Sequence, residues 1–188
     1  MELLLKEIEK LISQKPDAII GIDGYCASGK TTLAVQLAQK FDAQIIHMDD
    51  FFLPLDMRTK ERLSQTGGNV HYERFNDEVV SGLGKGVEFA YRAFCCKTGD
   101  YGENRVVLPR KLVIIEGSYA FHPHINMKYD LKIFLKSDYE TRLERILKRN
   151  GAAALEVFKS KWIPLENRYF EEFDIESKCD IIIKQTEK

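Results

Sequence analysis

Short apolar runs alternate with amphipathic stretches along this chain of 188 residues, and the alternation predicts strands and helices in turn. Apolar runs of strand length occupy five segments: Ala18–Asp23, Ala43–Met48, Lys111–Gly117, Leu131–Leu135 and Cys179–Lys184. Apolar residues at helical spacing occupy four others: Met1–Ile12, Lys30–Phe41, Tyr72–Leu83 and Ser137–Gly151. Strands that alternate with helices favour an α/β fold with three layers, in which helices cover both faces of a five-stranded parallel sheet.

The last of these helices has recognisable boundary signals. Ser137 and Glu140 have the spacing of a capping box, and Gly151 stands where a helix commonly ends. Within the helix, Leu143, Ile146 and Leu147 are predicted to form the buried stripe.

The stretch 84–110 breaks the alternation. Tyr91, Phe94, Val106 and Val107 flank the Gly-containing string "TGDYGEN" there, which is typical of a turn between two strands. We interpret the stretch as a small inserted hairpin that covers a site. The length of the chain favours a single domain over residues 1–188.

Charge balance and cysteine spacing argue against several functional classes. The chain has 28 basic and 29 acidic side chains, so it lacks the basic excess of proteins that bind nucleic acid. No apolar run approaches the length of a membrane span, so no membrane partner is expected. The four cysteines match no zinc pattern or disulfide framework, and free thiols without a signal peptide point to the cytoplasm. The composition leaves open whether the protein forms a homo-oligomer.

The segment after the first predicted strand carries a phosphate-binding motif. It reads G-x-x-x-x-G-K-[ST] from Gly24 to Thr31, between a predicted strand and a predicted helix, as the motif requires. Such a P-loop wraps backbone N–H groups around the phosphates of ATP, and the helix N-terminus adds its dipole. The residues expected to bind the nucleotide are Gly24, Ala27, Ser28, Gly29, Lys30, Thr31 and Thr32. Within this set, Lys30 reaches the β- and γ-phosphates and Thr31 ligates Mg²⁺.

An acidic pair at the end of the second predicted strand favours a kinase among P-loop proteins. The chain has no guanine-reading N-K-x-D motif. The string "HMDDFFLP" instead places Asp49 and Asp50 at a strand end, where α/β sheets bind their ligands. A carboxylate there can take the proton from an attacking hydroxyl, although capping a turn is the simpler role for such a residue.

Four strings resemble a known family. "GIDGYCASGKTTLA", "MDDFFLP", "IIEGSYAFHP" and "RLERILKRN" are similar to the uridine kinase, phosphoribulokinase and pantothenate kinase family, and "DDFF" is also similar to ribosylnicotinamide kinases. The resemblance runs from Gly21 to Arg149 and is weakest between Thr59 and Pro109. It implies a P-loop NTPase fold with a helical lid, and it places the catalytic base at Asp49.

The resemblance also implies a metal ligand and a phosphate-closing lid. Glu116 ends the third predicted strand, where the family has a carboxylate beside Mg²⁺; turning to solvent is the alternative for this residue. The family's lid corresponds to residues 138–170. Its arginines close on the phosphates, and we favour Arg145 and Arg149 over Arg142 for this role, the alternative being a solvated basic face.

The acceptor side departs from the family pattern. Nucleoside kinases of this family usually have an Asp that holds ribose hydroxyls, and His71 stands in its place here. Tyr72, which follows it, and Tyr91 and Arg92 in the insertion are the other candidate acceptor contacts. His71 and Arg92 could equally be surface residues. Trp162 and the pair His122 and His124 are interpreted as packing and loop residues.

These features predict an ATP- and Mg²⁺-dependent kinase that transfers the γ-phosphoryl group to a hydroxyl of a small molecule. The first candidate acceptor is a nucleoside, as in uridine kinase. The alternatives are another small alcohol, such as ribosylnicotinamide, pantothenate or a sugar, and a regulatory ATP-binding protein without kinase activity.

Overall fold

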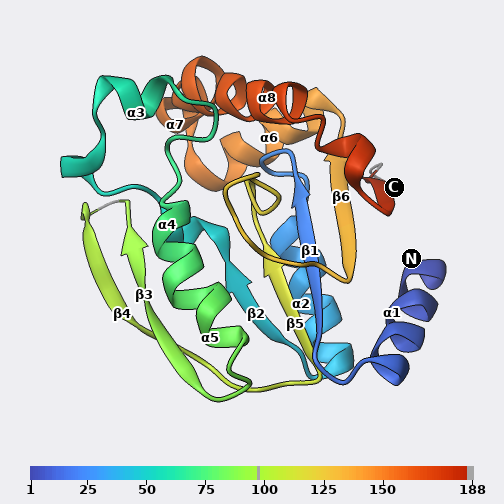
Figure 1. Cartoon of the computed structure of the whole chain (residues 1–188). Coiled ribbons are helices and arrows are strands. Elements are labelled where there is room, and N and C mark those ends of the chain that lie inside the picture. The colour runs from blue at the N-terminus through green and yellow to red at the C-terminus, as the bar shows by residue number, and fades with distance from the viewer. Residues whose placement is uncertain (97, 186–188) are drawn as a thin grey trace.

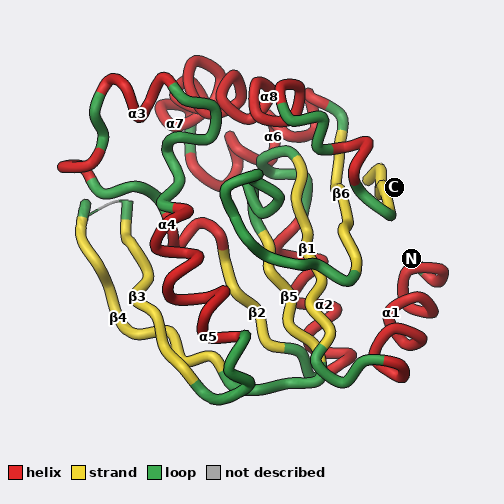
Figure 2. Tube along the Cα trace, in the orientation of Figure 1, coloured by secondary structure: helices red, strands yellow, loops and turns green. Residues whose placement is uncertain are grey.

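The computed structural model describes residues 1–96 and 98–185, and its centre is a parallel sheet of five strands. The strands lie in the order β2-β5-β1-β6-β7 (Figures 1 and 2). Their bounds are β1 (Ala18–Gly24), β2 (Gln44–His47), β5 (Leu112–Glu116), β6 (Leu131–Ser137) and β7 (Ile181–Gln185). The predicted five-stranded parallel sheet is therefore confirmed, with β1 in the middle.

Side chains alternate between the two faces of the sheet along each strand, and each face has its own hydrophobic core. Ile20 and Ile114 pack on one face of the sheet, whereas Ile19 and Ile115 pack on the other. Because β1 and β5 are buried on both faces, their sequences are continuous apolar runs, as expected of central parallel strands.

Helices cover both faces, which gives the three predicted layers. α1 (Glu2–Gln14) and α2 (Lys30–Phe41) pack on one face. The other face is covered by α8 (Ile163–Glu172) and by a helical segment of three consecutive parts: α4 (Tyr72–Phe75), a π-helical turn (Asn76–Val80) and α5 (Ser81–Leu83). A short helix, α3 (Lys60–Ser64), lies between β2 and α4 in the sequence. Among the described residues, no helix is both long and apolar enough to cross a membrane.

The predicted hairpin is present between α5 and β5. β3 (Phe89–Cys95) and β4 (Asp100–Val107) pair antiparallel and form a separate two-stranded sheet (Figure 1). The hairpin attaches to the core through Tyr91, whose ring centroid lies 4.9 Å from that of Phe51. It therefore borders the segment that follows β2.

The helices after β6 correct two details of the predictions. α6 runs from Tyr139 to Asn150 and ends at Gly151 (φ 84°) as expected, but its N-cap is Asp138 and no side chain caps it. The capping box from Ser137 is therefore wrong, because Ser137 is still the last residue of β6. Leu147 is 46% exposed, so it does not belong to the buried stripe.

The remaining helices form an almost continuous bent segment. α7 (Ala152–Val157), a π-helical turn (Phe158–Trp162) and α8 follow one another, so the chain is helical from Ala152 to Glu172. α6, α7 and α8 lie together over one end of the sheet in Figure 1. This end carries the carboxyl termini of the strands, and the P-loop, Asp49 and Glu116 all follow or end strands there.

Candidate functional site

The P-loop has the backbone conformation that phosphate binding needs. Gly24 (φ 138°), Ala27 (φ 57°) and Gly29 (φ 96°) all have positive φ, and α2 starts directly at Lys30. The ammonium group of Lys30 donates to Gly24 O at 2.7 Å and to Tyr25 O at 2.9 Å. Lys30 is thus held over its own loop, at the helix N-terminus where phosphates bind.

Thr31 and Glu116 meet beside the P-loop. The Thr31 hydroxyl donates to the two Glu116 carboxylate oxygens at 3.1 and 3.2 Å. His47 Nδ1 lies 2.5 Å from Glu116 Oε1, and this hydrogen bond raises the pKa of His47. Glu116 is only 4% exposed, and a hydroxyl with a buried carboxylate is a donor set that suits Mg²⁺. The described residues contain no cluster of three His, Cys, Asp or Glu side chains that could hold a metal alone, so phosphate and water oxygens would complete the shell.

A cavity of about 590 Å³ joins these groups to the lid. Its lining includes nine of the predicted site residues: Ala27, Gly29, Lys30, Thr31, Thr32, Asp49, Glu116, Arg145 and Arg149. They come from four segments of the chain, and the order of the strands places them together.

The two acidic residues after β2 separate in the structure. Asp49 lines the cavity, and the protein around it raises its pKa, mainly through desolvation. Asp50 does not line the cavity; its carboxylate accepts a hydrogen bond from the Tyr91 hydroxyl at 2.9 Å. Asp49 is thus the member of the pair that faces the cavity, where it is exposed, and a raised pKa suits a general base.

The three arginines of α6 also separate. Arg145 and Arg149 line the cavity, and Arg145 donates to Ala27 O of the P-loop at 3.1 Å. Arg142 is 5% exposed, and its guanidinium lies 4.5 Å from the centroid of the Tyr25 ring. Arg142 therefore packs against Tyr25 of the P-loop and supports its structure, whereas Arg145 and Arg149 face the cavity.

The four predicted acceptor contacts all lie outside the cavity lining. Tyr72 is 7% exposed and lies between the Arg62 guanidinium and the His122 ring, at 4.0 and 5.0 Å. His71 is the residue before α4, and the Tyr91 hydroxyl is engaged with Asp50. The exposed Arg92 donates to Tyr101 O across the hairpin. Their contact with an acceptor remains a prediction, and the present contacts of Tyr72, Tyr91 and Arg92 support structural roles.

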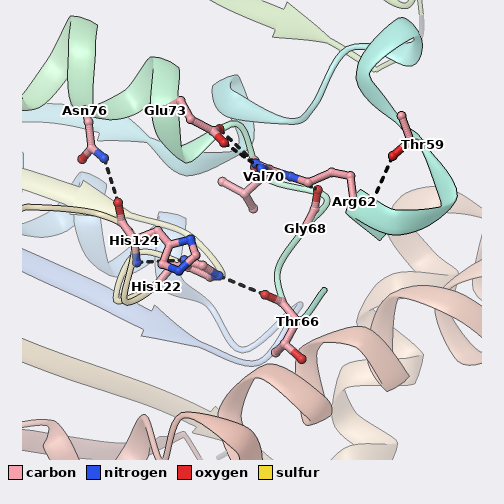
Figure 3. A network of polar contacts seen from close by, with 9 residues as sticks. All are labelled: Thr59, Arg62, Thr66, Gly68, Val70, Glu73, Asn76, His122 and His124. Carbon is pink, nitrogen blue, oxygen red and sulfur yellow. Dashed lines mark hydrogen bonds and ion pairs between the residues drawn. The ribbon is translucent and has the colours of Figure 1, made fainter. Parts of the chain in front are cut away.

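Arg62 is the centre of a polar network around the loop between α3 and α4 (Figure 3). It pairs with both carboxylate oxygens of Glu73 at 2.6 and 2.9 Å, and it donates to Gly68 O and Val70 O. His122 joins the same network through Thr66 O at 3.0 Å. These contacts hold the loop between α3 and α4 against the loop that follows β5.

The contacts of His122 determine its protonation. Thr66 O can only accept, so Nε2 carries the proton, and Nδ1 accepts from the His124 N–H at 3.2 Å. A proton on Nδ1 would oppose that donor, and burial already lowers the pKa of His122. The folded state therefore prefers the neutral ring.

We expect His122 to make the protein less stable in mild acid. Below its ordinary pKa of 6.5, His122 takes up a proton in the unfolded chain but stays neutral in the folded chain. The contribution of the neutral ring to the free energy of unfolding is therefore complete above pH 6.5. It is lost as the pH falls from 6.5 through the lowered pKa. Urea unfolding between pH 8 and pH 5 should show this loss, and His122→Gln should flatten the slope. The exposed ring of His124 provides the matched control, His124→Gln, which should keep the slope; an unchanged slope in His122→Gln would contradict the assignment.

Two buried carboxylates at the site were not anticipated. Glu166 of α8 lines the cavity, is 6% exposed, and accepts from Cys26 N of the P-loop at 2.9 Å and from the Ser118 hydroxyl at 2.6 Å. Glu166 lies on the same buried face of α8 as Ile163 and Phe170. A carboxylate on an otherwise apolar helix face was the sequence signal that could have identified it.

Asp23, at the end of β1, is the second. It is fully buried and accepts from Gly24 N, Phe121 N and the Tyr169 hydroxyl at 2.7, 3.1 and 2.8 Å. Burial raises its pKa to about 6 in spite of these donors. Asp23 thus ties the P-loop to the loop after β5 and to α8. Its place at the end of the first predicted strand, directly before the P-loop, was the available signal.

Comparison with known proteins identifies similar sequences. A family model described as phosphoribulokinase / uridine kinase family matches residues 19–154. The chain is 29% identical to uridine-cytidine kinase B of Dictyostelium discoideum, over 71% of this chain and 58% of that protein. It is 26% identical to nicotinamide riboside kinase of Saccharomyces cerevisiae, over 88% of this chain and 78% of that protein. A match to uridine kinase-like protein 4 of Arabidopsis thaliana covers only 31% of that protein, so the chain spans only part of several relatives.

Solved structures share the fold. A possible uridine kinase from Bacillus stearothermophilus superposes with a TM-score of 0.66 at 20% identity, covering 97% of this chain and all of that one. A fructose transport system kinase homologue from Silicibacter gives a TM-score of 0.65 at 20% identity, covering 88% of this chain and 89% of that one. At this level of identity, the likeness concerns the fold alone.

Proposed function

Because the chain belongs to the phosphoribulokinase / uridine kinase family, we propose that it is an ATP- and Mg²⁺-dependent kinase that phosphorylates a hydroxyl group of a small metabolite. One observation carries the proposal: Lys30 of the P-loop, Glu116 beside Thr31, and Asp49 all line one cavity. These are the cation, the metal-binding carboxylate and the base that phosphoryl transfer to an alcohol requires.

In this proposal the P-loop and the lid hold the phosphates of ATP. The backbone amides of residues 24–32 and the Lys30 ammonium bind the β- and γ-phosphates, and Arg145 and Arg149 approach them from α6. Thr31 and Glu116 supply oxygen ligands for Mg²⁺, which when bound neutralises charge on the phosphates.

Asp49 acts on the acceptor. Its carboxylate accepts the proton of the acceptor hydroxyl as the oxygen attacks the γ-phosphorus, and ADP leaves from the opposite side. Desolvation raises the pKa of Asp49 and so makes it a stronger base than an ordinary aspartate. The cavity orients the two substrates for this in-line transfer.

Two acceptor classes are supported by different observations. The names of the relatives favour a nucleoside, such as uridine, cytidine or nicotinamide riboside. The position of His71 outside the cavity lining favours another small alcohol, because no residue expected to hold ribose lines that cavity. A regulatory ATP-binding protein would need no base at Asp49, so this third reading is the weakest.

A coupled assay tests the proposal. The panel contains uridine, cytidine, nicotinamide riboside, pantothenate and pentoses, each with and without a phosphate or carboxylate group. We expect the γ-phosphoryl group of Mg·ATP to be transferred to one member of this panel. Omission of Mg²⁺ should abolish the activity. Tight ATP binding with no acceptor-dependent ADP release from any panel member would contradict the kinase proposal and favour a regulatory protein.

A further inference from the structure

A second cavity of about 400 Å³ adjoins the first. It lies between α8 and the segment that follows β2, and its lining includes Phe52, Arg58, Asn69, Lys161, Trp162 and Arg168. None of the six residues was assigned a role in the proposed transfer. The cavity is large enough for a metabolite of a few carbons or for one end of a larger one.

The charge of this cavity is of one sign. Three cationic side chains line it, and no Asp or Glu does. Among the described residues, Arg58 and Lys161 form no ion pair with a carboxylate; Arg58 Nε donates to Leu53 O at 2.7 Å, and the Lys161 ammonium lies 4.7 Å from the centroid of the Trp162 ring. Arg168 pairs with Glu172 at 3.2 Å on the exposed side of its helix. Uncompensated cations in a concave site focus a field that attracts an anion.

A buried amide adds hydrogen-bonding capacity that the protein does not use. Asn69 is 9% exposed, and its Nδ2 has no hydrogen-bond partner in the part of the chain that the structure describes. Burial raises the pKa of the neighbouring Tyr119 and this amide lowers it, yet the Tyr119 hydroxyl also has no hydrogen-bond partner in bonding geometry among the described residues. Tyr119 lines the first cavity and Asn69 lines the second. Buried polar groups are normally satisfied, so two such groups between the cavities point to a polar ligand.

The two cavities share a wall. Phe52 and Trp162 line both, and their ring centroids lie 6.0 Å apart. Phe52 follows Asp49 by three residues, and the Arg58 guanidinium lies beside the thiol of Cys96, which lines the first cavity. The second cavity therefore adjoins the one that Asp49 lines, with this pair of rings at their boundary.

We infer that the second cavity binds the anionic group of the acceptor, a carboxylate or a phosphate monoester, so that the substrate is an anionic alcohol. The inference rests on the proposed kinase function for the identity of the ligand. Arg58 binds the anion through its planar guanidinium group, Lys161 contributes a point charge, and the Asn69 amide donates the last hydrogen bond. The hydroxyl end of the same molecule then lies at Asp49.

Calorimetric titration without ATP tests this inference separately from turnover. The probes are ribose 5-phosphate and glycerate, with ribose and glycerol as their neutral counterparts. We expect at least one of the two anions to bind and both neutral compounds to bind at least about tenfold more weakly, because a hydrogen bond to a charged group contributes this much. Whichever anion binds identifies the phosphate or the carboxylate as the natural group.

Variants locate the bound anion. Arg58→Gln and Lys161→Gln should each weaken its binding about tenfold, whereas Lys159→Gln, in the same helical turn and paired with Glu156, should not. The P-loop is also expected to bind phosphate, so Lys30→Met tests whether the probe binds there instead. If the probe binds in the second cavity, this variant should leave the affinity for the probe unchanged. Binding that depends on Lys30 but not on Arg58, or equal affinity for charged and neutral probes, would overturn the inference. The kinase proposal would survive that result, because the coupled assay with neutral acceptors decides it.

Discussion

The Asp49→Asn variant is expected to lose about a thousandfold in the rate of phosphoryl transfer while it keeps its affinity for ATP. General-base catalysis contributes about 10²- to 10⁴-fold, and an amide of the same shape cannot accept the proton. Among the described residues, no hydrogen bond joins Asp49 to the P-loop, so we expect nucleotide binding to be kept. The loss should therefore appear in kcat and not in the dissociation constant of ATP.

Asp50→Asn is the matched control for this experiment. It makes the same chemical change one residue along, at a carboxylate that accepts from Tyr91 and does not line the cavity. An asparagine oxygen can accept the same hydrogen bond, so the variant should keep most of its activity. Steady-state kinetics with the acceptor found in the panel and calorimetry with ATP provide the two readouts. Equal losses in both variants, or full activity in Asp49→Asn, would show that Asp49 is not the base.

The Gly24→Ala variant is expected to lose about 2–5 kcal/mol of unfolding free energy. A Cβ at this position would lie 1.9 Å from the backbone oxygen of Leu135, and φ is 138°. Overpacking of this kind costs about 1–3 kcal/mol, and a left-handed backbone adds about 1–2 kcal/mol for a residue with a side chain. The obstacle is the main chain of β6, which cannot rotate away as a side chain could.

Gly86→Ala separates the cost of the steric clash from the cost of the backbone conformation. Gly86 also has positive φ (66°), but nothing lies within 4 Å of the position of its Cβ. Only the backbone contribution remains there, so its loss should be about 1 kcal/mol. Urea unfolding measures both variants through the midpoint and slope of the transition. Similar losses in the two variants would mean that the contact between the P-loop and β6 does not constrain this glycine.

The local sequence was sufficient for most secondary structure and for the P-loop. β1 and β5 are buried on both faces, and this produces the continuous apolar runs that predicted them. The Gly24–Thr31 spacing predicted a loop that the structure places between a strand and a helix. Ser137 and Leu147 were misassigned because a helix boundary and the edge of a buried stripe depend on what packs against them.

The site was predictable where a residue ends a strand. Asp49 and Glu116 follow this rule, because parallel strands bring their carboxyl ends to one edge of the sheet. The acceptor side does not follow it. Tyr72 packs into the core between two loops, and Glu166 reaches the P-loop from a helix some 140 residues away, as the hydrogen bond to Cys26 records.

By itself, then, the sequence determined the parallel α/β sheet, the phosphate-binding loop and the strand-end carboxylates, since each depends on neighbours in the chain or on the common direction of the strands. Only the tertiary structure decided which member of each local group faces the cavity. It placed Asp49 there and turned Asp50 to Tyr91, and it placed Arg145 there and packed Arg142 on Tyr25. The physical reason is that neighbouring residues of one type, such as the two aspartates, cannot be told apart by the local sequence. Their burial, electrostatic environment and hydrogen bonds depend on segments that only folding brings together.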